Sequence, residues 1–208
     1  MRALHDRVAA LADVAPGESV LDVGCGTANL SLAVLRAQPA ALVTGLDPDG
    51  SALRTAARKA SRRRVPLTLV QGFADRLPAD DGSVDHVVSA LALHHVPEED
   101  RTRFGAEALR VLRPGGRVTI VDFAESDRAG RRGHGSRGHG SGGHGSAGHG
   151  RGHAGHGPAT AAGDQHAVRN LEGGLVRLLT DAGFTGAREA ERVEHRFGPL
   201  AFVQATRG

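Results

Sequence analysis

Short apolar runs alternate with amphipathic segments along the first 125 residues of this chain. The runs V-L-D-V, V-V-S and V-T-I-V are typical of strands that are buried on both faces of a sheet. The segments between them repeat apolar residues at helical spacing, as Leu4, Val8 and Leu11 do. Strands that alternate with helices predict right-handed crossovers and a parallel sheet covered by helices on both faces.

The elements of this first part follow from where each pattern starts and stops. We expect strands at 19–23, 41–46, 67–70, 84–89 and 117–123, and helices at 1–14, 30–35, 51–60 and 98–112. Pro114, Gly115 and Gly116 predict a sharp turn before the fifth strand.

The last part of the chain predicts a helix at 171–182 and strands at 188–197 and 200–205. The joint between these two strands is short, so we expect an antiparallel hairpin. The last strand then opposes the parallel ones. The expected fold class is α/β, with a seven-stranded sheet that is mostly parallel, its last strand antiparallel, and helices on both faces.

Between these parts lies a tract, residues 126–164, with 14 Gly, six His and five Arg and almost nothing apolar. Such a tract buries too little surface to offset its ordering entropy, so we expect a disordered insertion after the fifth strand. Residues 1–125 and 165–208 are then expected to form one domain.

The histidines of the tract are candidate metal ligands, because imidazole suits zinc, copper and nickel, and glycine lets several side chains converge. They are His134, His139, His144, His149, His153 and His156. Three interpretations stay open: an inert repeat-expanded loop, a zinc or nickel site, and a basic loop that attracts phosphate. A metal-binding or metal-responsive protein is therefore the alternative function.

The composition excludes several classes of partner and site. The formal net charge is only +3, so no dominant polyanion such as nucleic acid is expected. One cysteine excludes a disulfide framework and a cysteine-based zinc site. No apolar run reaches the length of a membrane span, and no signal-peptide core precedes residue 14, so a cytoplasmic protein is expected. The oligomeric state is not predicted.

A glycine-rich turn follows the first strand. Gly24 and Gly26 let the backbone turn sharply and approach a ligand closely, beside the free amides of the next helix. Asp47 ends the second strand, where a carboxylate can accept hydrogen bonds from two ribose hydroxyls. That acid fits an adenosine cofactor or a dinucleotide. The dinucleotide fingerprint needs a third glycine where Asn29 stands, which weakens an oxidoreductase interpretation.

Five motifs in order resemble class I S-adenosylmethionine-dependent methyltransferases, in the branch of small UbiE-like enzymes. They are V-L-D-V-G-C-G-T at 20–27, L-D-P-D at 46–49, Q-G-F-A-D-R-L-P with D-G-S-V-D within 71–85, L-H-H-V at 93–96 and L-R-V-L-R-P-G-G at 109–116. The resemblance covers residues 15–125 well and 166–208 more loosely. It implies a Rossmann-like fold, S-adenosyl-L-methionine as cofactor, and in-line methyl transfer to a small-molecule acceptor.

The same resemblance implies the cofactor contacts. Gly24 and Gly26 would line the methionine part, Asp22 would hold its ammonium directly or through water, and Asp47 would take the ribose hydroxyls. The full expected set is Asp22, Gly24, Cys25, Gly26, Thr27, Asp47, Pro48, Gly72, Phe73, Ala74, Ser89 and Ala90.

Two positions depart from the family pattern. Phe73 stands where the family usually has Asp or Asn on the adenine amino group, so Phe73 offers only apolar contact. Two alternatives stay open: the Ala74 amide reads the ring, with a loss of affinity, or Asp75 substitutes for the missing acid. Ala28 stands where glycine is common, and we expect it to be tolerated. Cys25 is expected to be a small buried filler beside the cofactor rather than a nucleophile.

His94 and His95 follow the fourth strand, at the edge where ligands bind in open α/β sheets. One of them is a candidate general base for an acceptor that must lose a proton. The alternative is that the pair orients the loop and packs under the cofactor. The acceptor itself is not predicted.

Overall fold

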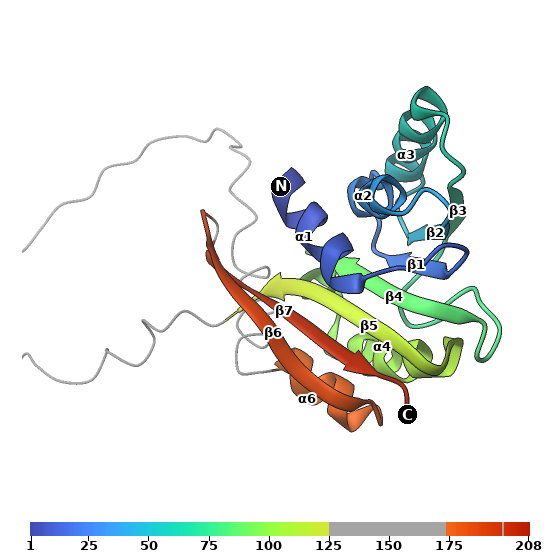
Figure 1. Ribbon diagram of the computed structural model, residues 1–208. Helices are drawn as coiled ribbons and strands as arrows, with labels where there is room; N and C mark the ends of the chain where they lie inside the picture. The colour runs from blue at the N-terminus through green and yellow to red at the C-terminus, as the bar shows by residue number, and fades with distance from the viewer. Residues whose placement is uncertain (125–173, 197) are drawn as a thin grey trace, which may run out of the picture.

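The computed structural model describes residues 1–124, 174–196 and 198–208. Seven strands form one sheet in the order β3-β2-β1-β4-β5-β7-β6 (Figure 1). Their bounds are β1 Ser19–Val23, β2 Leu42–Asp47, β3 Thr68–Gln71, β4 Val84–Ala90, β5 Leu112–Phe123, β6 Thr185–His195 and β7 Gly198–Thr206. The first five pair in parallel, and β7 pairs antiparallel with both β5 and β6.

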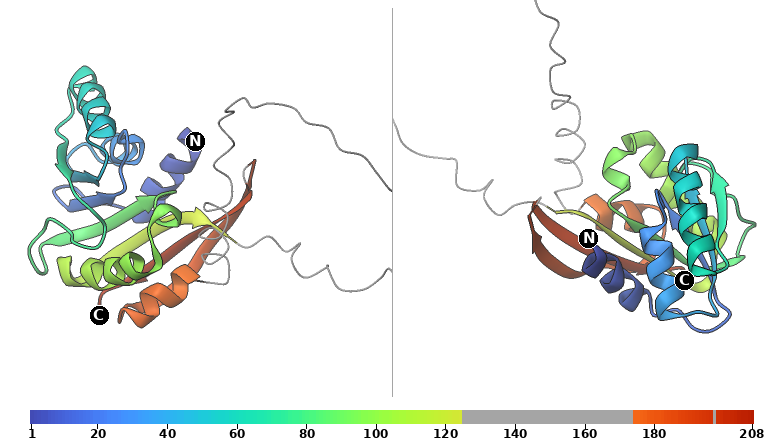
Figure 2. Two further views of the ribbon diagram at one scale, coloured as in Figure 1. Left: turned by 180° about the vertical axis from the view of Figure 1, so that it is seen from behind. Right: turned by 90° about the horizontal axis from the view of Figure 1, so that it is seen from above.

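Helices cover both faces of this sheet (Figures 1 and 2). They are α1 Arg2–Ala12, α2 Asn29–Ala37, α3 Gly50–Arg63, α4 Glu98–Val111 and α6 Gly174–Asp181, with a short 3-10 helix, η1, at Leu93–His95. One apolar cluster joins α1 and α2 to the strands through Val8 and Val34. A second cluster, on the opposite face, joins α4 and α6 through Phe104 and Leu179. Alternate strand residues feed the two clusters, as the predicted double burial requires.

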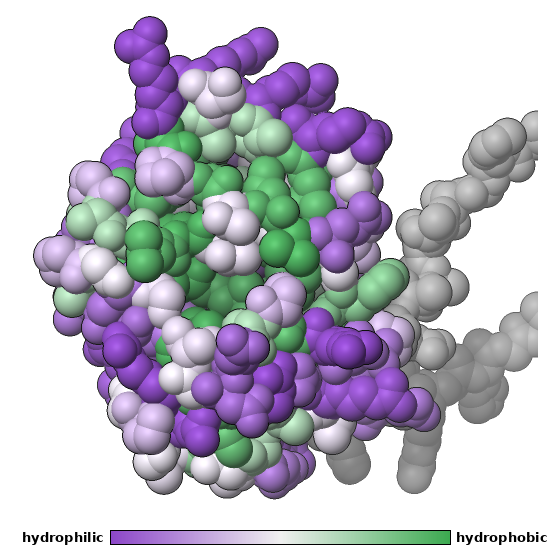
Figure 3. All heavy atoms as spheres, turned by 90° about the vertical axis from the view of Figure 1, so that its right-hand side faces the viewer, coloured by the Kyte–Doolittle hydropathy of each residue, from purple (hydrophilic) through white to green (hydrophobic). Residues whose placement is uncertain are grey.

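The helix α3 is amphipathic, because its apolar residues recur every three to four positions. Leu53, Ala56 and Ala60 are buried under it, while its arginines face outward. In Figure 3 the hydrophilic side chains crowd the top of the molecule, the level at which α3 stands in Figure 1.

These observations confirm the predicted fold class and the C-terminal hairpin. The expected sharp turn at Pro114-Gly115-Gly116 is different: the strand already begins at Leu112, and the turn is an irregularity inside β5. Val84 pairs with Leu112 and His86 with Arg117, so the residues between form a bulge, with Gly115 at φ 81°.

Three other expectations concern the helix at 171–182, the insertion at 126–164 and membrane spans. The helix predicted at 171–182 is described from Gly174, and its first three residues lie outside the described residues. The predicted insertion at 126–164 also lies outside them. Over the described ranges, no helix is long and apolar enough to cross a membrane.

Candidate functional site

A cavity of about 500 Å³ lies at the carboxyl edge of the sheet, where β1 and β2 end. One wall comes from the ends of these two strands, a second from the segment after β3, and a third from the segment after β4. Parallel strands place all their carboxyl ends on one edge, which is why residues so far apart in sequence meet here. Seven predicted residues line it: Gly24, Asp47, Pro48, Gly72, Phe73, Ala74 and His95.

The remaining predicted residues do not line this cavity. They are Asp22, Cys25, Gly26, Thr27, Ser89, Ala90 and His94. Two of them lie behind residues of the cavity wall. The Ser89 hydroxyl donates to the carbonyl oxygen of Val23 over 2.8 Å, and Asp22, which precedes Val23 in β1, is fully buried.

Sequence reasoning missed the apolar residues of the segment after β4. Leu91, Ala92, Leu93, Val96 and Pro97 all line the cavity. Leu91 adopts a left-handed backbone, φ 54°, which is uncommon for a residue other than glycine and concentrates at ligand sites. The L-H-H-V motif pointed to this segment, but only its histidines suggested chemistry.

The glycine turn is tied to the end of β2. The amides of Gly24 and Cys25 both donate to the Leu46 carbonyl oxygen, over 2.8 and 3.0 Å, and the Gly26 amide donates to Asp47 Oδ2 over 2.7 Å. Gly24 and Gly26 have φ of 72° and 52°, values that favour glycine. The turn and the carboxylate at the end of β2 therefore form one unit.

Replacing Gly24 by alanine should destabilise this unit. A Cβ at position 24 would lie 2.3 Å from the Cβ of Ala92, and the backbone there is left-handed. We expect a loss of roughly 2 kcal/mol in the free energy of unfolding. Urea unfolding of Gly24→Ala measures it, with Gly17→Ala as the control, since Gly17 is also left-handed at φ 82° but its Cβ would meet nothing within 4 Å. Equal losses in the two variants would contradict the proposed clash.

Asp22 carries an unusual carboxyl. Its Oδ2 accepts hydrogen bonds from the amide and the hydroxyl of Ser31, whereas its Oδ1 is buried without a hydrogen-bond partner. Burial raises the pKa of Asp22 to about 7, against the opposing effect of the Ser31 hydrogen bonds. A buried acceptor atom left unpaired is costly, so a cationic ligand group that approached Oδ1 would favour the ionised form.

This raised pKa makes stability depend on pH. The folded carboxyl binds a proton more tightly than the unfolded one, so stability is lost as the pH rises through about 4 to 7. Between pH 5 and 8 the Asp22 contribution should fall by roughly 2–3 kcal/mol. Urea unfolding at both pH values, for the native chain and Asp22→Asn, measures it. A variant with the same pH dependence as the native chain would show that another group is responsible.

His94 is paired with the buried carboxylate of Asp122, the acid near the end of β5. Asp122 is fully buried, and its Oδ1 lies 2.7 Å from His94 Nδ1. Asp122 Oδ2 accepts the His94 amide over 3.0 Å, so the same carboxylate fixes both the backbone and the ring. The rings of His94 and Phe123 pack in a T-shaped arrangement, with centroids 4.9 Å apart.

His95 lies against this pair from the cavity side. The rings of His94 and His95 have centroids 3.9 Å apart. Burial, and then the neighbouring His94, lower the pKa of His95, which favours its neutral form. The two histidines therefore differ: one is held by a carboxylate, and the other lines the cavity.

The other candidate residues, Cys25 and the histidines of the tract, add no reactive group to the described site. Burial raises the pKa of the Cys25 thiol, which keeps the side chain a neutral filler. The six histidines proposed as metal ligands all lie outside the described residues, so zinc or nickel binding there stays a prediction. Within the part of the chain that the structure describes, no group of three or more His, Cys, Asp or Glu side chains could hold a metal ion.

Sequence comparison relates this chain to methyltransferases. A family model described as a methyltransferase domain matches residues 20–116. The ubiquinone/menaquinone biosynthesis C-methyltransferase UbiE of Rhizobium johnstonii is 36% identical over 115 residues, 54% of this chain and 44% of the relative. The 27-O-demethylrifamycin SV methyltransferase of Amycolatopsis mediterranei is 35% identical over 122 residues, 58% of this chain and 44% of the relative. The chain thus spans less than half the length of these relatives.

Solved structures share the whole fold at low identity. A SAM-dependent methyltransferase from Aquifex aeolicus has a TM-score of 0.66 at 19% identity, over 98% of this chain and 89% of its own. The [4+2]-cyclase SpnF has a TM-score of 0.71 at 21% identity, over 99% of this chain and 80% of its own. Since a cyclase shares the fold, the fold alone leaves the reaction open.

Proposed function

We propose that this chain, which belongs to the class I S-adenosylmethionine-dependent methyltransferases, transfers the cofactor's methyl group to a hydroxyl oxygen of a small organic acceptor. The observation that carries the choice of a hydroxyl is the pair formed by His94 and the buried Asp122 beside the cofactor cavity. An alcohol or phenol must lose a proton to become a good nucleophile, and an imidazole held by a carboxylate is suited to take it. The name of the rifamycin relative indicates an oxygen acceptor and supports this choice, whereas the name of the UbiE relative indicates a carbon acceptor, so the two relatives do not decide between them.

The residues of the site fit this cofactor. The unpaired Oδ1 of Asp22 is a buried acceptor that a ligand ammonium would satisfy, directly or through water. A Cβ built on Gly26 meets nothing within 4 Å, so the backbone is open to a close ligand there. Phe73 is 68% exposed at the cavity, although a phenyl ring is apolar, and an adenine ring would cover it.

Asp47 is the proposed ribose ligand. Its two oxygens already accept the amides of Gly26 and Asp49, over 2.7 and 2.9 Å. A carboxylate has about four lone-pair sites, so each oxygen can accept one more hydrogen bond, from a ribose hydroxyl. These two hydrogen bonds fix the orientation of the Asp47 carboxylate before the ligand arrives. Ala74 and Gly72 would offer backbone to the adenine, as the resemblance implies.

His94 is the proposed general base. Its Nδ1 is committed to Asp122, so Nε2 is the nitrogen that can take a proton. Bound in the cavity, the cofactor supplies an electrophilic methyl group on a sulfonium, for in-line displacement. His94 then removes the acceptor's proton while Asp122 stabilises the imidazolium that forms. The apolar side chains of Leu91, Ala92, Leu93 and Val96 limit the access of water to the reacting atoms.

Calorimetric titration with S-adenosylmethionine and with NAD tests the cofactor, and a screen of phenolic, alcoholic and carbon acceptors with methyl-labelled cofactor tests the reaction. We expect micromolar binding of S-adenosylmethionine, no binding of NAD, and label on hydroxyl oxygens. Binding without transfer to any hydroxylated acceptor would exclude the proposed reaction, and label on carbon alone would assign a different acceptor class.

A further inference from the structure

Lys59 is the one lysine of a chain whose Lys and Arg residues total 26. It lies half-buried on α3, and its ammonium faces the start of α2. Nζ donates to the Thr27 carbonyl oxygen over 3.0 Å, to Thr27 Oγ1 over 2.6 Å, and to Asn29 Oδ1 over 2.9 Å. An ammonium has three donor hydrogens, so these contacts use all of them.

The contacts complete the attachment of the glycine turn. Leu46 and Asp47 hold its first half, residues 24–26, from the end of β2, as described above. Lys59 holds its second half from α3. The turn is therefore fixed at both ends by the one β2–α3 unit that also carries the proposed ribose ligand.

Between these attachments lies a strained residue. Ala28 is fully buried and left-handed, with φ 62°, at the position where α2 begins. Its amide donates to the Cys25 carbonyl oxygen over 2.7 Å. A left-handed alanine is unfavourable because its Cβ crowds the backbone, and such a residue persists only when its surroundings hold it in place.

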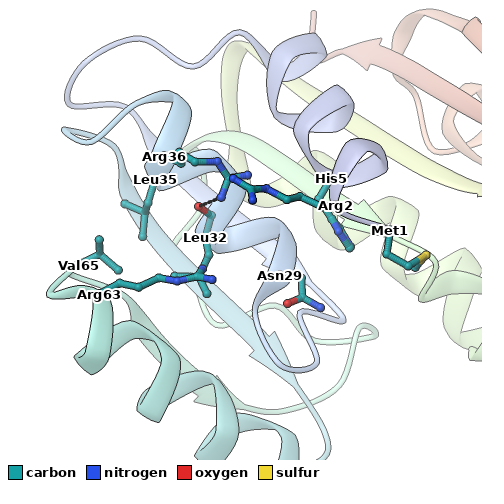
Figure 4. Close-up of a pocket in the computed structure, with 9 residues that line it drawn as sticks. All are labelled: Met1, Arg2, His5, Asn29, Leu32, Leu35, Arg36, Arg63 and Val65. Atoms are coloured by element: carbon teal, nitrogen blue, oxygen red, sulfur yellow. Dashed lines mark hydrogen bonds between the residues drawn. The ribbon is translucent and has the colours of Figure 1, made fainter.

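An arginine would serve this position poorly. The three acceptor atoms converge on one point, which suits a compact ammonium, whereas a planar guanidinium presents its donors as a rigid fork. The neighbouring Arg63 extends toward Leu32 along the groove between α1, α2 and α3, where Asn29 also lies (Figure 4). Desolvation and this arginine lower the pKa of Lys59, in keeping with its enclosed place.

We infer that Lys59 is a positioning residue for the cofactor: it holds the turn, with Ala28 left-handed, in the conformation that binds S-adenosylmethionine. The effect on cofactor binding rests on the proposed function, whereas the effect on the conformation of the turn does not. Neither Lys59 nor Asn29 lines the cofactor cavity. Lys59 therefore acts through the turn, and its loss should affect cofactor binding and leave the acceptor untouched.

The first measurement is hydrogen exchange of the amides of residues 24–31 in the cofactor-free protein. We expect faster exchange there in Lys59→Met, and unchanged exchange in Arg62→Met, which removes an exposed charge from the same helix. This measurement does not depend on the cofactor. Native exchange rates across the turn in Lys59→Met would overturn the inference even if the protein proved to bind another ligand.

The second measurement is the Kd of S-adenosylmethionine by calorimetry. We expect about a tenfold rise in Lys59→Met, as for the loss of charge-assisted hydrogen bonds, no rescue in Lys59→Arg, and no change in Arg62→Met. The KM of the acceptor should not move. In the double variant Ala28→Gly with Lys59→Met, glycine adopts φ 62° without strain, so part of the affinity should return.

The outcomes separate the two proposals. A native protein that binds no S-adenosylmethionine ends the proposed function, and hydrogen exchange then judges Lys59 alone. Native affinity in Lys59→Met, or an equal loss in Arg62→Met, overturns the positioning role. Thermal unfolding without cofactor accompanies each titration. If Lys59→Met is unfolded at the assay temperature, Lys59→Gln replaces it, with the same expected and contradicting results.

Discussion

Replacing His94 by glutamine should lower kcat by about 10²–10⁴-fold on a hydroxylated acceptor, with the Kd of the cofactor unchanged. Glutamine retains a polar side chain near Asp122 but cannot take a proton from the acceptor. Single-turnover kinetics with labelled cofactor measures the methyl-transfer step directly.

Asp122→Asn provides the matched test of the same pair. An asparagine can hold the His94 backbone amide, but it no longer stabilises a charged imidazolium, so kcat should fall while the cofactor binds normally. An acceptor that is ionised without help, such as a nitrophenol, should be nearly insensitive to both variants. If that acceptor loses as much rate as an alcohol does, His94 and Asp122 are structural, and the alternative that they orient the loop is correct.

Asp47→Ala should raise the Kd of S-adenosylmethionine by two to three orders of magnitude. The substitution removes the acceptor for two ribose hydroxyls and also frees the Gly26 amide, which Asp47 Oδ2 holds over 2.7 Å. Both losses affect the same ligand, because the turn and the acid are one unit. Calorimetric titration measures the change, and kcat at saturating cofactor should stay within a few-fold of the native value.

Asp49→Ala is the control for this prediction. Asp49 lies two residues further along and caps α3, since its carboxylate accepts the Ser51 amide over 2.7 Å. Its loss should lower the free energy of unfolding slightly, because a helix cap is removed, and leave cofactor affinity nearly native. A similar loss of affinity in the two variants would mean that cofactor affinity depends on the total negative charge at this edge, and that Asp47 makes no specific contact.

Much of the fold could be predicted from local pattern. The strand at Ser19–Val23 has the bounds that the apolar run predicts, and most other elements differ by only a few residues. The exception is the R-P-G-G segment before β5. Proline and glycine indicate a turn, but pairing with Val84 on one side and His86 on the other keeps the segment in the strand as a bulge. Cross-strand hydrogen bonds are not visible in a local pattern.

The candidate site was predictable where a motif carries it. Gly24, Asp47 and Phe73 were expected from short motifs, and all three line the cavity. Leu91 and Ala92 were missed, because an apolar residue before a histidine pair gives no sign that it faces a ligand rather than the core. Asp122 was missed for a similar reason: an acid near the end of a buried strand gains meaning only when its partner is known.

By itself, the sequence determined the alternation of strands and helices, the order of the motifs and the glycine turn, because each depends on residues close together in the chain. Only the tertiary structure decided which of His94 and His95 is held by a carboxylate, since Asp122 lies 28 residues further along the chain. It also decided that Lys59, on α3, contacts the glycine turn and the start of α2 through three hydrogen bonds. Both results depend on side chains brought together by packing, and no local pattern encodes such distances.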